Sequence, residues 1–114
     1  MTAPRERRYL EHIAESIALI GEYVVDGHPA FFEHRQVQDA VLRRLEILAD
    51  ATGQLSPELK DRHPDIPWRA VYGFRNIAAH AYLDVDLERV WEIVTDHLPP
   101  LRAAVEKELD AGST

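Results

Sequence analysis

The sequence predicts an all-α fold, a bundle of four or five helices, and three observations indicate it. Apolar residues recur at steps of three and four residues through most of the chain. Glycine and proline interrupt this recurrence at intervals that leave segments of helical length. No segment shows the strict alternation of apolar and polar residues that is typical of a half-buried strand. A chain of 114 residues has room for one core, so we expect a single domain over residues 1–114.

The first two helices follow from two apolar stripes that are separated by a break. The first stripe has the spacing of one helix face: Leu10, Ile13, Ile17, Ile20 and Val24. Gly27, His28 and Pro29 then interrupt the pattern. The second stripe precedes Gly53, near which the second helix is expected to end: Val37, Val41, Leu45 and Leu48.

The second half of the chain predicts two further helices and a fifth helical piece. Residues 56–67 contain three prolines and are expected to form a loop, with one helical turn at residues 57–60. Pro67 suits the first position of a third helix, whose apolar stripe is Trp68, Val71, Phe74 and Ala78. Asp84 or Asp86 can cap a fourth helix, whose inward residues are Leu87, Val90, Trp91, Val94 and Leu98. Because a proline inside a helix removes a hydrogen bond and clashes with the preceding turn, Pro99 and Pro100 predict a kink or short break.

The composition excludes several classes of protein. A chain without cysteine cannot be a disulfide scaffold, use a cysteine nucleophile or bind zinc through cysteine. The net charge of −7 disfavours sequence-independent coating of DNA but does not exclude a small anion site. No apolar run is long enough to span a bilayer, and the arginine-rich N-terminus lacks the apolar part of a secretory signal. We therefore expect a cytoplasmic protein without membrane contact.

Four polar side chains able to do chemistry fall within eight residues, in the segment 66–82 that reads IPWRAVYGFRNIAAHAY: Arg75, Asn76, His80 and Tyr82. On a continuous helix, Arg75 and Tyr82 project in nearly the same direction, and Asn76 and His80 can touch. His80 and Tyr82 point apart on such a helix. The four groups therefore converge only if the helix ends near His80 or if another chain completes the site.

These side chains suit the cleavage of an RNA phosphodiester. A neutral His80 can take a proton from a 2′-hydroxyl, and its imidazolium form can give one to the leaving 5′-oxygen. Arg75 can bind the non-bridging oxygens, Asn76 can orient His80 or bind phosphate, and Tyr82 can stack on a base. No metal or other cofactor is required, because the nucleophile belongs to the substrate. A two-fold dimer would supply both a base and an acid, with Trp68, Val71 and Phe74 as an apolar seam.

Plainer interpretations of the same residues remain open. An arginine and a histidine near a helix end commonly cap it or pair at the surface. The chain can also be a non-catalytic helical module that binds a nucleotide or a partner protein. The cluster Arg5, Arg7 and Arg8 suits either a solvated helix start or a guide for RNA, and the same choice applies to the pair of arginines at positions 43 and 44.

A metal site is not favoured by the six histidines. His28 and His34 fall in an expected loop and helix entry, and no HExxH pattern or tight set of His and carboxylate ligands occurs. His12 and His97 are expected to be surface or interface residues. The sequence also lacks a G-x-S-x-G turn and a glycine-rich phosphate loop.

The segment from His63 to Tyr82 resembles the signature of the HepT-like ribonuclease toxins, which belong to the HEPN superfamily of small helical bundles. The shared features are Ile-Pro-Trp at the helix start, a glycine and an apolar residue before Arg-Asn, and then R-x4-H-x-Y. The last helices, with their break at Leu-Pro, are also similar to the family's. The resemblance covers nearly the whole chain in organisation.

The resemblance implies a homodimeric, metal-independent endoribonuclease that is the toxin of a toxin–antitoxin pair. Arg75 and His80 match the catalytic pair, and Asn76 matches the polar residue after the arginine. Tyr82 matches the tyrosine to which a minimal nucleotidyltransferase antitoxin transfers AMP, which would add bulk and negative charge at the cleft. Where the family often has an acidic or polar residue, this sequence has Ala81, so no supporting carboxylate is expected there. The chain can alternatively be only a scaffold for AMP transfer.

Overall fold

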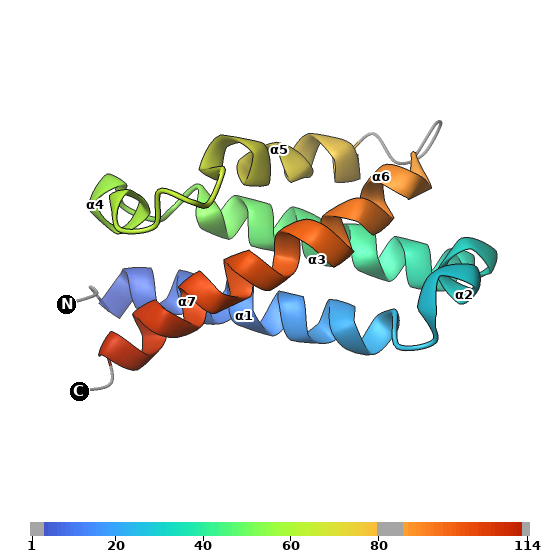
Figure 1. Cartoon of the computed structure of the whole chain (residues 1–114), viewed down its shortest axis with the longest axis horizontal. Coiled ribbons are helices and arrows are strands. Elements are labelled where there is room, and N and C mark those ends of the chain that lie inside the picture. Colours follow the sequence, from blue (N-terminus) through green and yellow to red (C-terminus); the bar gives the residue numbers. More distant parts are fainter. Residues whose placement is uncertain (1–3, 80–85, 113–114) are drawn as a thin grey trace.

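The computed structural model describes residues 4–79 and 86–112, and all regular structure in these ranges is helical. Three helices lie side by side: α1 (Pro4–Tyr23), α3 (Arg35–Thr52) and α5 (Trp68–Ala79). Across one face of them runs a C-terminal helical segment: α6 (Leu87–Glu92), the π-helical η1 (Ile93–His97) and α7 (Leu98–Gly112) (Figure 1). Two short helices join the long ones: α2 (Gly27–Glu33) and α4 (Pro57–Asp61). None of the helices in the described ranges is both long and apolar enough to cross a membrane.

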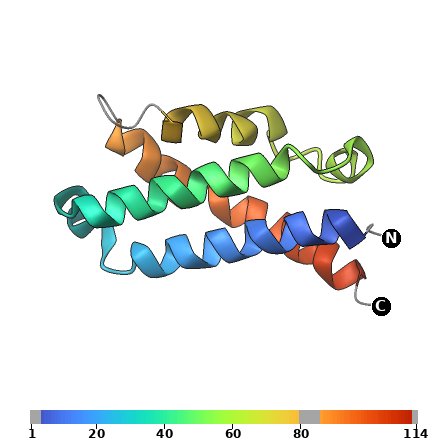
Figure 2. The ribbon, with the colours of Figure 1, turned by 180° about the vertical axis from the view of Figure 1, so that it is seen from behind.

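The prediction of an all-α fold is confirmed. With α6, η1 and α7 taken as one run, the described part of the chain has about six helices rather than four or five. α3 is the central element, since it packs against both α1 and α5. Seen from behind, α1 and α3 lie in front and α7 lies at the back, so one face of the three-helix layer is left uncovered by α7 (Figure 2).

The predicted apolar stripes form the core. Leu10, Ile13, Ile17 and Ile20 of α1 are buried, and so are Val41, Leu45 and Leu48 of α3. α7 adds Leu101 and Val105 to the same core. Burial of each such side chain contributes about 1.5–3 kcal/mol relative to its exposure to water. Val71 and Phe74 of α5 are 1% and 0% exposed, because both side chains are buried in the core of the single chain. The prediction that these two residues form a dimer seam is therefore wrong.

The break predicted at Gly27, His28 and Pro29 contains a helix of its own. Gly27 has a φ of +90°, a left-handed conformation that favours glycine, and it turns the chain directly into α2. Pro29 lies in the first turn of that helix, where its missing N–H has no partner to lose. Phe31 is 1% exposed and anchors α2 to the core. Tertiary packing therefore makes a helix where the local sequence predicts only an interruption.

The helical path also continues where Pro99 and Pro100 predict a kink or break. Neither proline can donate the N–H that an α-helix would direct at the carbonyls of Thr95 and Asp96. The chain widens into the π-helix η1 just before the prolines, and the N–H of Leu98 bonds to the carbonyl of Ile93, five residues back. The prolines then lie in the first turn of α7.

The connection between α4 and α5 is held by polar contacts. Ser56 caps α4 by accepting a hydrogen bond from the N–H of Leu59, and the N–H of Ser56 donates to Glu6 of α1. The indole of Trp68 donates to the carbonyls of Lys60 and His63, both at 3.1 Å. The helical turn predicted at residues 57–60 is thus confirmed as α4, and these contacts fix where α5 begins.

Candidate active site

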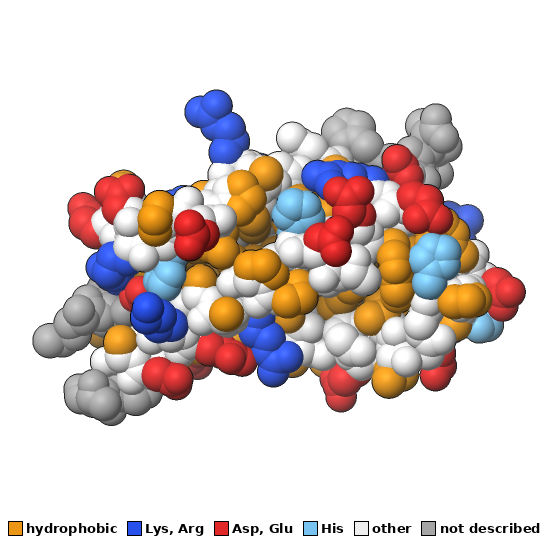
Figure 3. All heavy atoms as spheres, viewed as in Figure 1, with side chains coloured by type: hydrophobic (Ala, Val, Ile, Leu, Met, Phe, Trp, Pro, Cys, Tyr) orange, Lys and Arg blue, Asp and Glu red, His pale blue; other side chains and the backbone are white. Residues whose placement is uncertain are grey.

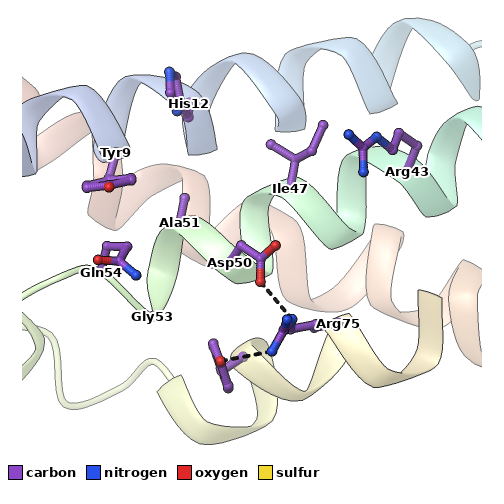
Figure 4. A pocket seen from close by; sticks show the side chains of 10 residues that line it. Tyr9, His12, Arg43, Ile47, Asp50, Ala51, Gly53, Gln54 and Arg75 are labelled. Carbon is purple, nitrogen blue, oxygen red and sulfur yellow. Dashed lines mark hydrogen bonds and ion pairs between the residues drawn. The ribbon is translucent and has the colours of Figure 1, made fainter. Parts of the chain in front are cut away.

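An open hollow lies on the face of the molecule that α7 leaves uncovered. Its volume is about 530 Å³, and α1, α3 and α5 all contribute to it. The lining residues are Tyr9, His12, Arg43, Ile47, Asp50, Ala51, Gly53, Gln54, Tyr72 and Arg75. Figure 4 shows these side chains, with Arg75 reaching from α5 toward α3. Of the two predicted site residues that the structure describes, Arg75 and Asn76, Arg75 lines this hollow.

Arg75 is held by two partners at the edge of this hollow. Its Nε lies 2.7 Å from Oδ1 of Asp50 on α3, and one terminal nitrogen donates to the hydroxyl of Tyr72 at 3.3 Å (Figure 4). The guanidinium carbon is 5.9 Å from the centre of the Tyr72 ring. These contacts use two of the five guanidinium N–H groups. Because the Arg75 side chain remains 50% exposed, the other N–H groups are able to meet an anion.

The position of Tyr72 depends on Gly53, which directly follows α3. A Cβ atom added at Gly53 would lie 2.6 Å from Cε1 of the Tyr72 ring, closer than carbon atoms pack. The backbone of Gly53 has a φ of −65° and a ψ of −18°, which any residue can adopt. Glycine is therefore needed here for the close approach of an aromatic ring and not for its conformational freedom.

The described lining of the hollow contains two arginines, and each of them has a carboxylate partner. Asp50, which also lines the hollow, pairs with Arg75. Arg43 pairs with Glu46 on the same helix. On the opposite face, which α7 crosses, acidic and basic side chains are interspersed (Figure 3). A small anion can still bind the guanidinium N–H groups that these ion pairs leave over, in spite of the net charge of −7.

The other predicted site residues are not brought together by the described part of the chain. Asn76 follows Arg75 on α5, is exposed, and is not one of the described residues that line the hollow. His80 and Tyr82 lie outside the described residues. The convergence of Arg75, Asn76, His80 and Tyr82 on one substrate stays a prediction.

Asp50, Gly53 and Tyr72 were not identified from the sequence. Tyr72 could have been, because it precedes Arg75 by three residues and residues at this spacing are neighbours on a helix surface. Asp50 and Gly53 carry no such local signal. They reach Arg75 and Tyr72 only because α3 packs against α5.

A second polar cluster ties α7 to the segment after α4. Glu108 is buried and accepts hydrogen bonds from Nε and a terminal nitrogen of Arg62, at 3.2 and 2.7 Å, and it contacts Nε2 of His63 at 2.7 Å. The hydrogen bonds from Arg62 hold the pKa of Glu108 below its usual range, and His63 acts in the same direction against the effect of burial. This cluster stabilises the fold, and none of its members lines the hollow.

The histidines in the described ranges have individual environments. His12 lines the hollow, His28 stacks on Phe32 and contacts Glu88, and the His97 ring lies 5.7 Å from that of Phe74. Within residues 4–79 and 86–112, no three His, Cys, Asp or Glu side chains form a group that could hold a metal ion.

A family model and several known proteins that match this chain point to the same family. The family described as "Ribonuclease HepT-like" matches residues 13–108. A Thermococcus cleftensis protein named "Probable ribonuclease HepT" is 38% identical over 100 residues, which cover 87% of this chain and 91% of that protein. A Methanocaldococcus jannaschii protein, named as a candidate RNase, is 30% identical over 101 residues, or 88% of this chain and 93% of that protein.

A longer relative contains a match to this chain as one part. It is a Methanocaldococcus jannaschii protein whose name combines a gamma-glutamylcyclotransferase with a candidate RNase, and it is 39% identical over 103 residues. The match covers 90% of this chain but 46% of that protein, so the chain spans about half the length of this relative. No solved structure gives a significant match.

Proposed function

This chain belongs to the HepT-like ribonuclease family, and from that membership we propose that it is a metal-independent endoribonuclease acting at the hollow that contains Arg75. One observation carries the proposal. The arginine that begins the R-x4-H-x-Y motif is held by Asp50 and Tyr72 at the edge of an open hollow, with guanidinium N–H groups left for a phosphate.

In the proposed reaction the substrate supplies its own nucleophile. The imidazole of His80 removes the proton of a ribose 2′-hydroxyl, and the 2′-oxygen attacks the adjacent phosphorus. The bond from phosphorus to the 5′-oxygen breaks, a 2′,3′-cyclic phosphate forms, and an imidazolium gives a proton to the leaving oxygen. Arg75 stabilises the charge that gathers on the non-bridging oxygens. Asn76, beside it in the chain, orients His80 or binds the phosphate.

A homodimer completes this chemistry. One chain contributes one motif histidine, whereas the reaction uses a base and an acid. Two motifs across a two-fold axis supply both. In mixed dimers of a wild-type chain and a His80→Ala chain, the shared site keeps one of its two histidines, so cleavage should fall well below half of the wild-type rate. A rate of half the wild-type value in such mixed dimers would mean two independent sites and would exclude a shared one.

The proposed regulation is transfer of AMP to Tyr82 by a minimal nucleotidyltransferase, which would make this chain the toxin of a toxin–antitoxin pair. The adduct would place a negative phosphate and a bulky nucleoside two residues from His80. After co-expression with the partner enzyme, mass spectrometry should find the added AMP on a peptide that contains Tyr82. AMP on another residue, with Tyr82 unmodified, would contradict this assignment.

Cleavage of a labelled RNA in the presence of a chelator tests the proposed reaction. The wild-type chain should cut it and leave cyclic phosphate ends, and a 2′-deoxy substrate should stay intact. His80→Ala should lower the rate by about 10²–10⁴, the usual contribution of general acid–base catalysis, and Arg75→Ala should cause a comparable loss. Arg102→Ala is the matched control, because Arg102 lies on α7 and pairs with Glu106 at the surface.

Two results would overturn the proposal. Undiminished cleavage by purified His80→Ala protein would remove the histidine from the mechanism. RNA left intact by the folded wild-type dimer would favour the alternative, a non-catalytic module that binds a nucleotide or a partner protein.

A further inference from the structure

A second hollow opens on α1 beside the candidate active site. It has a volume of about 590 Å³ and is lined by Pro4, Arg5, Arg8, Tyr9 and His12. The last four are spaced so that they share one face of a helix, on the steps i, i+3, i+4 and i+7. Tyr9 and His12 also line the hollow that contains Arg75. The two hollows therefore adjoin along this face of α1.

The arginines of the combined lining fall into two kinds. Among the described residues, those at positions 43 and 75 pair with Glu46 and Asp50, whereas Arg5 and Arg8 add two further positive charges. In the part of the chain that is described, no carboxylate forms an ion pair with Arg5 or Arg8. Their neighbour Arg7 has a different role, because it pairs with Glu11 and donates to the carbonyl of Leu109 on α7. Arg5 and Arg8 are exposed, so their guanidinium groups can bind external anions.

Aromatic rings lie between these cations. The guanidinium carbon of Arg5 is 5.9 Å from the centre of the Tyr9 ring, and the rings of Tyr9 and His12 meet edge to face with their centres 6.2 Å apart. Cations that follow a strand's phosphates, together with flat rings on which bases stack, are how proteins hold single-stranded nucleic acid. Arg5, Arg8 and Tyr9 offer both kinds of contact on one face of α1.

From this arrangement we infer that an RNA strand engaged at Arg75 continues along α1, with its phosphates on Arg5 and Arg8 and a base on Tyr9 or His12. The inference rests on the proposed function, since it names the path of the same substrate. Residues 5 to 12 span about 10 Å of helix axis, the length of about three stacked nucleotides. The chain should therefore prefer a single strand that extends beyond the scissile phosphate.

The test is binding of fluorescent single-stranded RNA of increasing length to His80→Ala protein, a background chosen so that the RNA stays intact. The double variant Arg5→Gln/Arg8→Gln should lower the slope of log affinity against log salt by about 1.4, the value for two phosphate contacts on a single strand. The control is Arg35→Gln/Arg102→Gln, which removes the same charge from residues outside both hollows.

A second pair of variants tests the stacking surface. Tyr9→Leu keeps an apolar side chain against the core but removes the ring, and it should weaken binding by roughly 5- to 150-fold. Tyr9→Phe keeps the ring and should bind RNA as wild type does. Equal affinity of Tyr9→Leu and Tyr9→Phe would show that no base stacks there.

Cleavage by the chain with His80 intact separates failure of this inference from failure of the proposed function. If wild type cleaves RNA while Arg5→Gln/Arg8→Gln binds long RNA as tightly and with the same salt slope as the control, the path along α1 is wrong. If wild type cleaves no RNA but binding depends on Arg5, Arg8 and Tyr9 as stated, the path stands and the ribonuclease assignment fails. Loss of binding to the nucleotidyltransferase, with RNA binding unchanged, would make the same surface a protein interface and overturn the inference.

Discussion

Replacement of Gly53 by alanine offers a test of how Arg75 is positioned. The added Cβ would lie 2.6 Å from Cε1 and 3.0 Å from Cδ1 of the Tyr72 ring. Carbon atoms pack at about 3.5–4.0 Å, so the ring must move by about 1 Å. Tyr72 is 43% exposed, and it can swing toward solvent without opening the core. The contact from Arg75 to its hydroxyl is already 3.3 Å long, and such a movement breaks it.

The expected effect on the rate follows from the lost hydrogen bond. A hydrogen bond of this kind contributes about 0.5–1.5 kcal/mol net, so kcat/KM for RNA should fall by about 2- to 10-fold. Stability should change little. Alanine fits the helical backbone of Gly53 and restricts the unfolded chain, a gain of about 0.4–1 kcal/mol, and the loss of ring contacts offsets it. A lower rate with an unchanged melting temperature is therefore the signature of this mechanism.

Gly21→Ala is the matched control, because Gly21 lies in α1 with nothing within 4 Å of its added Cβ. It should stabilise the chain slightly and leave the rate unchanged. Tyr72→Phe removes the hydroxyl alone and should reproduce the loss seen in Gly53→Ala. The two changes combined should cost no more than either one, since both break the same contact. Full activity of Tyr72→Phe, or additive losses in the double variant, would refute the proposed link from Gly53 to Arg75.

Two further predictions concern stability. Because the pKa of folded Glu108 is lowered, chiefly by hydrogen bonds from Arg62, its contribution is complete above the unfolded value of about 4.3 and is lost as the pH falls through the folded value. Unfolding in urea at several pH values should show a decline below about pH 4.5 that Glu108→Gln makes shallower; equal slopes would contradict this. Ser16 is fully buried, and its hydroxyl has no hydrogen-bond partner in the described structure. Ser16→Ala should raise the free energy of unfolding by about 1 kcal/mol and the melting temperature by about 4–8 °C, whereas a decrease would mean that the hydroxyl has a partner.

The helices that the sequence predicted best are those with a long one-sided stripe. Leu10, Ile13 and Ile20 of α1 are all essentially inaccessible, because hydrophobic burial acts on each of them in the same direction and the period of a helix is regular. Such a stripe needs no knowledge of the rest of the chain. The short α2 is the opposite case, since Gly27 and Pro29 are interrupting residues locally and Phe31 packs into a core that distant helices build.

Pro99 and Pro100 interrupt the hydrogen bonding of a helix, and the sequence shows this interruption but not how the backbone accommodates it. The missing N–H groups are evident from the residue types. Either a break in the helix or a local change of helix type can accommodate the missing N–H groups. Which of the two occurs depends on what the helix packs against. Leu98 and Leu101, on either side of the prolines, are both buried, so a break would expose apolar surface that the π-helix keeps in the core.

The candidate site also has a part that the sequence predicted and a part that depends on tertiary packing. Arg75 was predicted because a short motif carries it, and its partner Tyr72 lies three residues before it on the same helix, whereas Asp50 belongs to α3. The two partners hold the arginine by different interactions, an ion pair and a hydrogen bond. Asp50 supplies an opposite charge and Tyr72 a neutral acceptor, and each takes one N–H of the guanidinium. Together they restrict its orientation at the surface, where an unrestrained arginine would lose more side-chain entropy when a phosphate binds.

The net charge of −7 does not decide whether this chain can bind RNA. At physiological ionic strength the field of an exposed charge is largely screened beyond about 8 Å, so a bound phosphate responds mainly to its neighbours. Along the described lining of the two hollows those neighbours are four arginines and Asp50, with Glu46 paired to Arg43 beside them. Acidic residues on other faces act instead on the encounter rate and on non-specific association. RNA binding by this chain should therefore be confined to one face, sensitive to salt, and weak on any strand that cannot reach both Arg75 and α1.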